Sequence, residues 1–170
     1  MSNAFLLIAE GIVTLLVLLE PPGPLDSDGN LKSFSAGFEQ HTGYAIAFFL
    51  LGLMIMKKAG KDLPQWVRVG CMWVSGVGGA GLILYDIDTK EHNYFAATAL
   101  IGPLALSTML WGYQFTWGIG AIVGWVAGIF AFLAANITDL KLNNLGLMGW
   151  MEIIIILALG VDWGPLLWDM

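Results

Sequence analysis

The sequence predicts an all-α, polytopic membrane protein: a bundle of about six transmembrane helices that forms a single domain over residues 1–170. The first observation is composition, because 58% of the residues are hydrophobic and only 12% are charged, whereas soluble domains carry about 25% charged residues. The mean hydropathy of +0.76 agrees with this. The second observation is that the apolar residues gather in separate runs, each close to the roughly 20 residues that cross a bilayer.

Each apolar run is bounded by polar residues, proline or glycine, and each is continuous and not alternating. Backbone groups in lipid must be hydrogen-bonded within the protein, and continuous runs favour helices over the strands of a barrel. The predicted spans cover residues 4–20, 42–57, 65–85, 94–113, 116–136 and 148–168.

The first predicted helix ends at Glu20 and Pro21 and has no basic segment before it. We therefore expect a retained helix and not a cleaved secretory signal. A long loop, residues 21–41, rich in proline, glycine and acidic residues, leads to the second helix. The second helix ends in lysines, and the third follows Pro64.

The fourth predicted helix contains Gly102 and Pro103 near its middle. Proline removes one backbone hydrogen bond, so a kink is expected there. A tight turn over residues 112–116 leads to the fifth helix, and a polar loop over residues 137–147 leads to the sixth. Five tryptophans near the predicted helix ends are expected to anchor at the lipid headgroups: Trp66, Trp111, Trp117, Trp150 and Trp168.

The charged residues predict an orientation and exclude some partners. Four of the seven basic residues lie in or beside the loop between the second and third helices, at Lys57, Lys58, Lys61 and Arg68. The positive-inside rule then places that loop and both termini on the cytoplasmic side of a cell or organelle membrane. The net charge of −6 argues against nucleic acid as a partner. The lipid bilayer is the partner that the composition predicts.

Small residues at four-residue spacing predict where helices pack closely, because helix association in lipid depends on close approach of the backbones. The fifth predicted helix carries Gly120, Gly124 and Gly128, and the third carries Gly76 and Ala80. These faces are candidates for the tightest internal packing. They are equally candidates for self-association or for a contact with another membrane subunit.

Two histidines and several acids are predicted to lie at the outer mouth of the bundle. The possible ligands are His41, His92, Glu39, Asp88 and Glu91. Imidazole and carboxylate at one depth suit a transition metal, and two imidazoles suit a haem iron. The alternative is ordinary helix capping by residues such as Glu91, with histidines at the interface.

A second set of polar residues falls inside the predicted spans. Glu10 and Asp162 are each expected about 9 Å from the inner end of their helices, and Arg68 lies near the inner end of a third. Carboxylates in a membrane are costly, so they are usually paired, protonated or in contact with water. They predict either a proton path or an ion pair of Arg68 with one acid. Glu152 belongs to the outer acidic cluster or faces headgroup water.

Three functions remain open from the sequence. The first is a structural or accessory subunit of a larger membrane complex, which the small size and the glycine faces favour. The second is a metal- or haem-dependent membrane enzyme or electron-transfer protein with its site at His41 and His92. The third is a small proton-coupled transporter that uses Glu10 and Asp162. No phosphate-binding loop or serine-hydrolase motif is present.

Overall fold

The computed structural model describes residues 3–19, 38, 42–86, 89–136 and 147–168. These residues form six long helices and no strand. The helices are α1 (Asn3–Leu19), α3 (Thr42–Ala59), α4 (Gln65–Leu84), α5 (Lys90–Gly112), α6 (Ile119–Asn136) and α7 (Leu147–Trp168). The all-α class predicted from the sequence is confirmed.

Five of these helices, α3 to α7, are long and apolar enough to cross a membrane. The remaining helix, α1, is apolar but has only 17 residues, which is the lower limit for a crossing helix. The observed bounds differ most from the predicted ones at α5, which begins at Lys90 and not at residue 94. The reason is an N-cap at Thr89, whose side chain accepts a hydrogen bond from the His92 backbone N–H.

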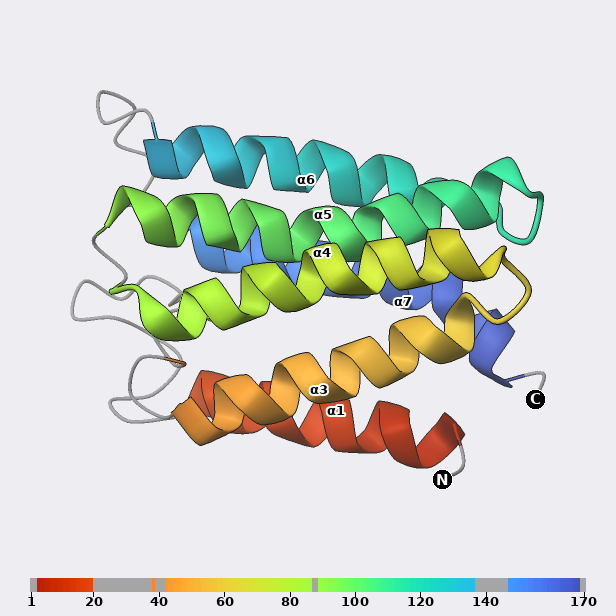
Figure 1. Ribbon diagram of the computed structural model, residues 1–170, viewed down its shortest axis with the longest axis horizontal. Helices are drawn as coiled ribbons and strands as arrows, with labels where there is room; N and C mark the ends of the chain where they lie inside the picture. Colours follow the sequence, from red (N-terminus) through yellow and green to blue (C-terminus); the bar gives the residue numbers. More distant parts are fainter. Residues whose placement is uncertain (1–2, 20–37, 39–41, 87–88, 137–146, 169–170) are drawn as a thin grey trace.

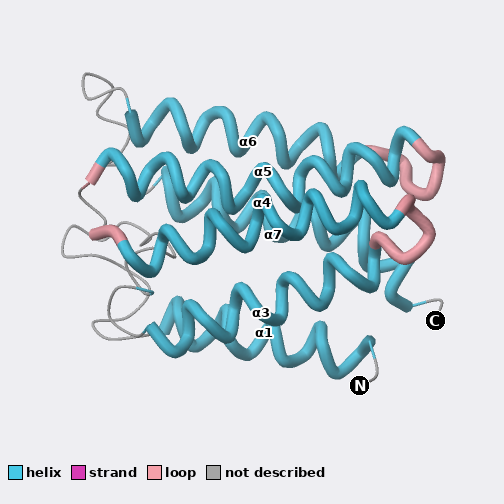
Figure 2. The backbone as a smooth tube through the Cα atoms, in the orientation of Figure 1, coloured by secondary structure: helices cyan, strands magenta, loops and turns pink. Residues whose placement is uncertain are grey.

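The helices run roughly side by side as three pairs of chain neighbours, α1 with α3, α4 with α5, and α6 with α7 (Figure 1). Short connections at residues 60–64 and 113–118 join antiparallel helices, and α4 and α5 also run antiparallel (Figure 2). The first and last helices meet at one end, where the Asn3 side chain donates a hydrogen bond of 3.1 Å to the Leu167 carbonyl. The first helix pair therefore lies against α7.

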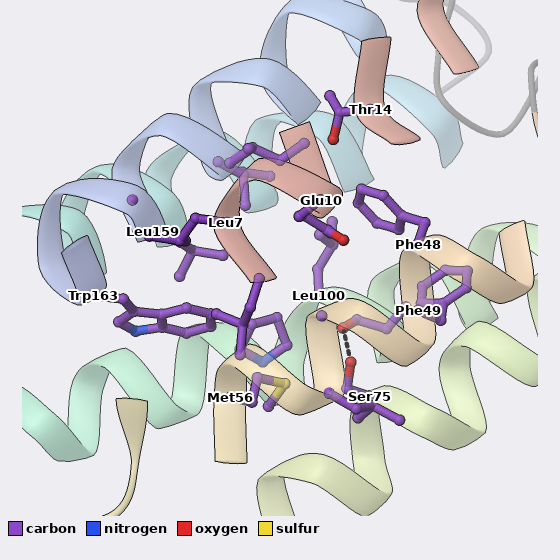
Figure 3. Close-up of a pocket in the computed structure, with 18 of the residues that line it drawn as sticks. Leu7, Glu10, Thr14, Phe48, Phe49, Met56, Ser75, Leu100, Leu159 and Trp163 are labelled. Carbon is purple, nitrogen blue, oxygen red and sulfur yellow. Dashed lines mark hydrogen bonds between the residues drawn. The ribbon is translucent and has the colours of Figure 1, made fainter. Parts of the chain in front are cut away.

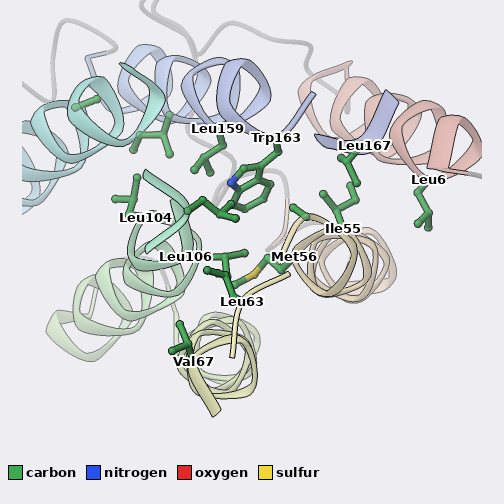
Figure 4. Packing of buried hydrophobic residues seen from close by; sticks show 14 residues of the cluster. Leu6, Ile55, Met56, Leu63, Val67, Leu104, Leu106, Leu159, Trp163 and Leu167 are labelled. Atoms are coloured by element: carbon green, nitrogen blue, oxygen red, sulfur yellow. The ribbon is translucent and has the colours of Figure 1, made fainter. Parts of the chain in front are cut away.

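The outside of the bundle is apolar. Large hydrophobic side chains are exposed along all six helices, which suits a surface in contact with lipid. The tryptophans predicted at helix ends are all exposed, from 46% at Trp111 to 89% at Trp117. Inside, one apolar cluster joins the helices (Figure 4), and its largest buried members include Leu6, Leu104, Leu106, Leu110 and Ile155.

The α4–α5 contact is close because glycines remove side chains from it. A Cβ at Gly78 would overlap the backbone of Ala99, and one at Gly102 would overlap the Cys71 carbonyl and Ser75. Pro103 cannot donate the helical hydrogen bond to the Ala99 carbonyl, four residues earlier. The Ser75 hydroxyl, buried on α4, donates to that carbonyl at 3.1 Å. The closeness of the two backbones thus lets α4 supply the hydrogen bond that Pro103 withholds.

This arrangement makes a testable prediction about Ser75 and Pro103. Ser75→Ala should lower the free energy of unfolding by about 1–2 kcal/mol, because the buried Ala99 carbonyl loses its donor. In a Pro103→Ala background the new backbone N–H can bond that carbonyl, so Ser75→Ala should cost much less. A double-mutant cycle from unfolding in mixed micelles measures this coupling. Additive effects of the two substitutions would contradict the interpretation.

Candidate functional site

A cavity of about 750 Å³ lies between the α1–α3 pair and the other helices (Figure 3). Its volume falls in the range of small-molecule sites, about 300–1,000 Å³. Side chains of α1, α3, α4, α5 and α7 line it, and nearly all are apolar. On α7 the lining residues run from Glu152 to Trp168, a distance of about 24 Å at 1.5 Å per residue. The cavity therefore extends through most of the depth of the bundle.

Glu10 is the acid that α1 places in this cavity. The α1 residues that line it, Leu7, Glu10, Gly11 and Thr14, have the three- and four-residue spacing of one helix face. Glu10 Oε2 is buried and has no hydrogen-bond partner. On α3, a Cβ built at Gly52 would lie 3.9 Å from Glu10 Oε1, so this glycine leaves room beside the carboxyl group. A carboxyl oxygen is thus held among apolar side chains with its acceptor capacity unused.

Trp163 contributes a second polar atom without a partner. The residue is 6% exposed and lines the cavity from α7, and its indole Nε1 is buried with no acceptor. Buried polar groups are nearly always hydrogen-bonded, so such exceptions need a physical account. Both residues line the cavity, one with a carboxyl oxygen and the other with an indole N–H that has no partner among the described residues.

Three further glycines widen the cavity. A Cβ built at Gly11, Gly160 or Gly164 would meet no atom within 4 Å, and all three glycines line the cavity. Glycine in a helix interior costs about 1 kcal/mol relative to alanine in water. Here the missing side chains leave open space, in contrast to the glycines of the α4–α5 contact.

Asp162, the other predicted intramembrane acid, is a structural residue and does not line the cavity. It is 3% exposed, and its carboxylate accepts three hydrogen bonds. The donors are the Ser107 hydroxyl at 2.7 Å, the Gly120 N–H at 3.0 Å and the Ala121 N–H at 2.9 Å. Those two N–H groups belong to the first turn of α6, which follows Gly118, a residue with no side chain to cap it. Asp162 therefore caps α6 from α7.

The predicted ion pair of Arg68 with Asp162 or Glu10 is absent from the part of the chain that the structure describes. Arg68 Nη1 donates instead to the Lys61 carbonyl at 3.3 Å, in the connection before α4. Asp162 needs no cation because three N–H and O–H donors already surround it. Glu152, expected in an outer acidic cluster or in headgroup water, lines the cavity near its opposite end from Trp168.

The predicted metal or haem site falls largely outside the described residues, which do not include His41, Glu39 and Asp88. His92 is 4% exposed, and its Nδ1 lies 2.8 Å from the Tyr85 carbonyl. A carbonyl can only accept, so Nδ1 carries the proton and Nε2, which is buried without a partner, is an acceptor. Glu91 is exposed. Among the described residues no group of three potential metal ligands lies together.

The glycine faces turn toward other helices of the same chain. Gly120 lies against Ala158 and Asp162 of α7, while Gly124 and Gly128 lie against Leu104 of α5. On α4, Gly76 only approaches Leu53 and Ala80 is exposed. The close contacts of that helix are made by a neighbouring set of glycines: Gly78, Gly79 and Gly81.

Sequence reasoning singled out Glu10 and Glu152 but missed the other cavity residues. Gly160 and Gly164 have the same four-residue spacing as glycines that pack against helices, so their spacing does not mark them as cavity residues. Trp163 lies within an apolar run, and its buried, unpartnered Nε1 gives no signal in a sequence. One sequence feature could have indicated the cavity: Glu10, Gly11 and Thr14 form a face of polar and small residues on α1.

Comparison of the chain with protein-family models, with curated proteins and with solved structures finds no match.

Proposed function

We propose that this protein is a membrane-embedded binding protein for a lipophilic small molecule, which it holds in the cavity between the α1–α3 pair and α7. The observation that carries the proposal is the apolar cavity of about 750 Å³ with a buried, partnerless carboxyl oxygen at Glu10. Apolar walls with a few convergent polar groups are the usual composition of a small-molecule site. The transporter hypothesis assigned a role to both Glu10 and Asp162. The present proposal keeps Glu10 as a ligand-binding residue and assigns Asp162 to helix capping.

The interpretation as an accessory subunit has less support. The small size and the two glycine faces favoured it, and outward-pointing faces would support it further. Gly120, Gly124 and Gly128 point into the bundle, whereas Ala80 of the other face is exposed. The exposed apolar side chains of the helices suit lipid equally well. The cavity, in contrast, is a specific feature that packing in a small bundle does not require.

Filling the cavity should weaken binding. Gly11→Leu and Gly160→Leu place side chains in open space, so the helices need not move. Each leucine would displace two or three methylene groups of a bound chain, at about 0.8 kcal/mol for each methylene. We expect each variant to weaken 1-dodecanol binding by about tenfold or more. Native mass spectrometry of the protein released from octyl glucoside micelles measures the bound fraction across a titration.

Gly70→Leu is the matched control. Gly70 is exposed on α4, does not line the cavity, and has no atom within 4 Å of its built Cβ. This variant should bind 1-dodecanol as the unchanged protein does. Helix content by circular dichroism should be the same in all variants. Equal dodecanol binding by the filled variants and the control would place the alcohol on the outer surface and would refute the proposal.

A further inference from the structure

We infer that the ligand of the cavity is a cationic amphiphile, an alkyl or similarly apolar chain bearing an ammonium group that binds the Glu10 carboxylate. This inference rests on the proposed function and names the class of ligand. It is carried by the unpartnered oxygen of Glu10, the absence of a basic residue from the described cavity lining, and the position of Glu10 along the cavity.

The charge of the walls favours a cation. Among the described lining residues, the acid Glu10 has a buried oxygen without a partner, and no residue is basic. An ionised carboxylate buried without a partner costs several kcal/mol, and a hydrogen-bonded cation removes most of that cost. An anionic ligand such as a fatty acid would add a like charge to the same apolar space. The walls therefore discriminate between ligands by sign of charge.

The position of Glu10 favours an amphiphile over a compact cation. The Asn3–Leu167 hydrogen bond sets the start of α1 level with the end of α7. Glu10 follows Asn3 by seven residues along α1, so it lies about 10 Å along a cavity wall of about 24 Å. Both directions from Glu10 are lined by apolar side chains, with Leu159 and Trp163 on one side and Phe48 and Phe49 on the other (Figure 3). A small hydrated cation would leave most of that surface empty.

No hydrogen bond joins a described residue to the Glu10 carboxyl group. Arg68 is engaged with the Lys61 carbonyl, the Ser75 hydroxyl is engaged with the Ala99 carbonyl, and the Trp163 indole N–H, although it has no acceptor, does not donate to Glu10. A ligand can supply the donor that Glu10 lacks in the described part of the chain. A primary ammonium group has three N–H donors, which suits a carboxylate in a confined apolar space.

The experiment compares three molecules with the same chain: dodecylamine, 1-dodecanol and dodecanoate. A hydrogen bond to a charged group contributes about 1.5–3 kcal/mol, so dodecylamine should bind about ten- to hundredfold more tightly than 1-dodecanol. Dodecanoate should bind least. In Glu10→Gln, which keeps the shape of the side chain, the ratio of dodecylamine affinity to dodecanol affinity should fall to near one. Native mass spectrometry titrations give all of these ratios.

The outcomes separate this inference from the proposed function. Binding of neither dodecylamine nor dodecanol, or binding that Gly160→Leu does not weaken, overturns the function itself. Cavity-dependent binding with no preference for dodecylamine leaves the function standing and overturns the inference. A preference for dodecylamine that survives Glu10→Gln also overturns it, because the ammonium group would then bind elsewhere.

Discussion

Asp162→Ala is expected to lower the free energy of unfolding by at least about 3 kcal/mol, the largest effect of any single polar substitution in the bundle. The substitution leaves the Ser107 hydroxyl and the Gly120 and Ala121 N–H groups without their acceptor. Gly118, which precedes α6, has no side chain that could replace it, and Gly120 and Ala121 are buried. Equilibrium unfolding in mixed dodecyl maltoside and dodecyl sulfate micelles, followed by circular dichroism, measures the change.

The matched variants for this prediction are Asp162→Asn and Asp62→Ala. Asparagine keeps one acceptor oxygen but adds an N–H₂ group among donors, so its stability should lie between that of aspartate and alanine. Asp62 is exposed in the connection before α4, and its replacement should change stability by no more than about 0.5 kcal/mol. Equal effects at positions 162 and 62 would show that the cap contributes nothing.

Gly78→Ala is expected to destabilise the protein by about 3 kcal/mol, although alanine is the better helix former. The added methyl group would overlap the Ala99 backbone, which cannot rotate away as a side chain does. The whole of α5 must shift, which would also strain the Ser75 hydrogen bond to Ala99. The same unfolding measurement, together with the yield of monodisperse protein, reports the effect.

Gly70→Ala on the same helix separates the clash from helix propensity. Gly70 has open space at its Cβ, so alanine there should leave stability unchanged or raise it by up to about 1 kcal/mol. The difference in unfolding free energy between Gly78→Ala and Gly70→Ala then measures how much the added methyl group destabilises the close α4–α5 contact. Similar stabilities of the Gly78 and Gly70 variants would mean that α5 moves away at little cost.

The fold was predictable because its determinants are local. Long apolar runs bounded by polar residues predict the helices. The predicted helix ends are wrong where a tertiary or capping interaction extends or shortens a helix. Thr89 lengthens α5 at its start, and Gly118, with its φ of 73°, delays the start of α6. Neither residue stands out in a hydropathy profile, so predicted ends were wrong by three to four residues at these two positions.

The sequence identified individual polar residues that are energetically unfavourable in a membrane. It did not predict how these residues are arranged relative to one another. The sequence marked Glu10, Asp162 and Gly120 individually. It could not show that Asp162 and Gly120 meet each other, while Glu10 faces the cavity, because these relations depend on how α1, α6 and α7 rotate about their axes. Glu10 and Asp162 have similar depths and similar chemistry, and helix rotation alone gives Asp162 a capping role and turns Glu10 toward the cavity.

The capping of α6 by Asp162 also bears on how the chain assembles. Protein synthesis delivers α6 to the bilayer before α7, so the first turn of α6 initially lacks the carboxylate that accepts its N–H groups. Exposed N–H groups are unfavourable in hydrocarbon, and α6 therefore gains its full stability only when α7 follows it. The start of α6 is thus completed by a residue about forty positions later in the chain, so α6 and α7 depend on each other for their stability.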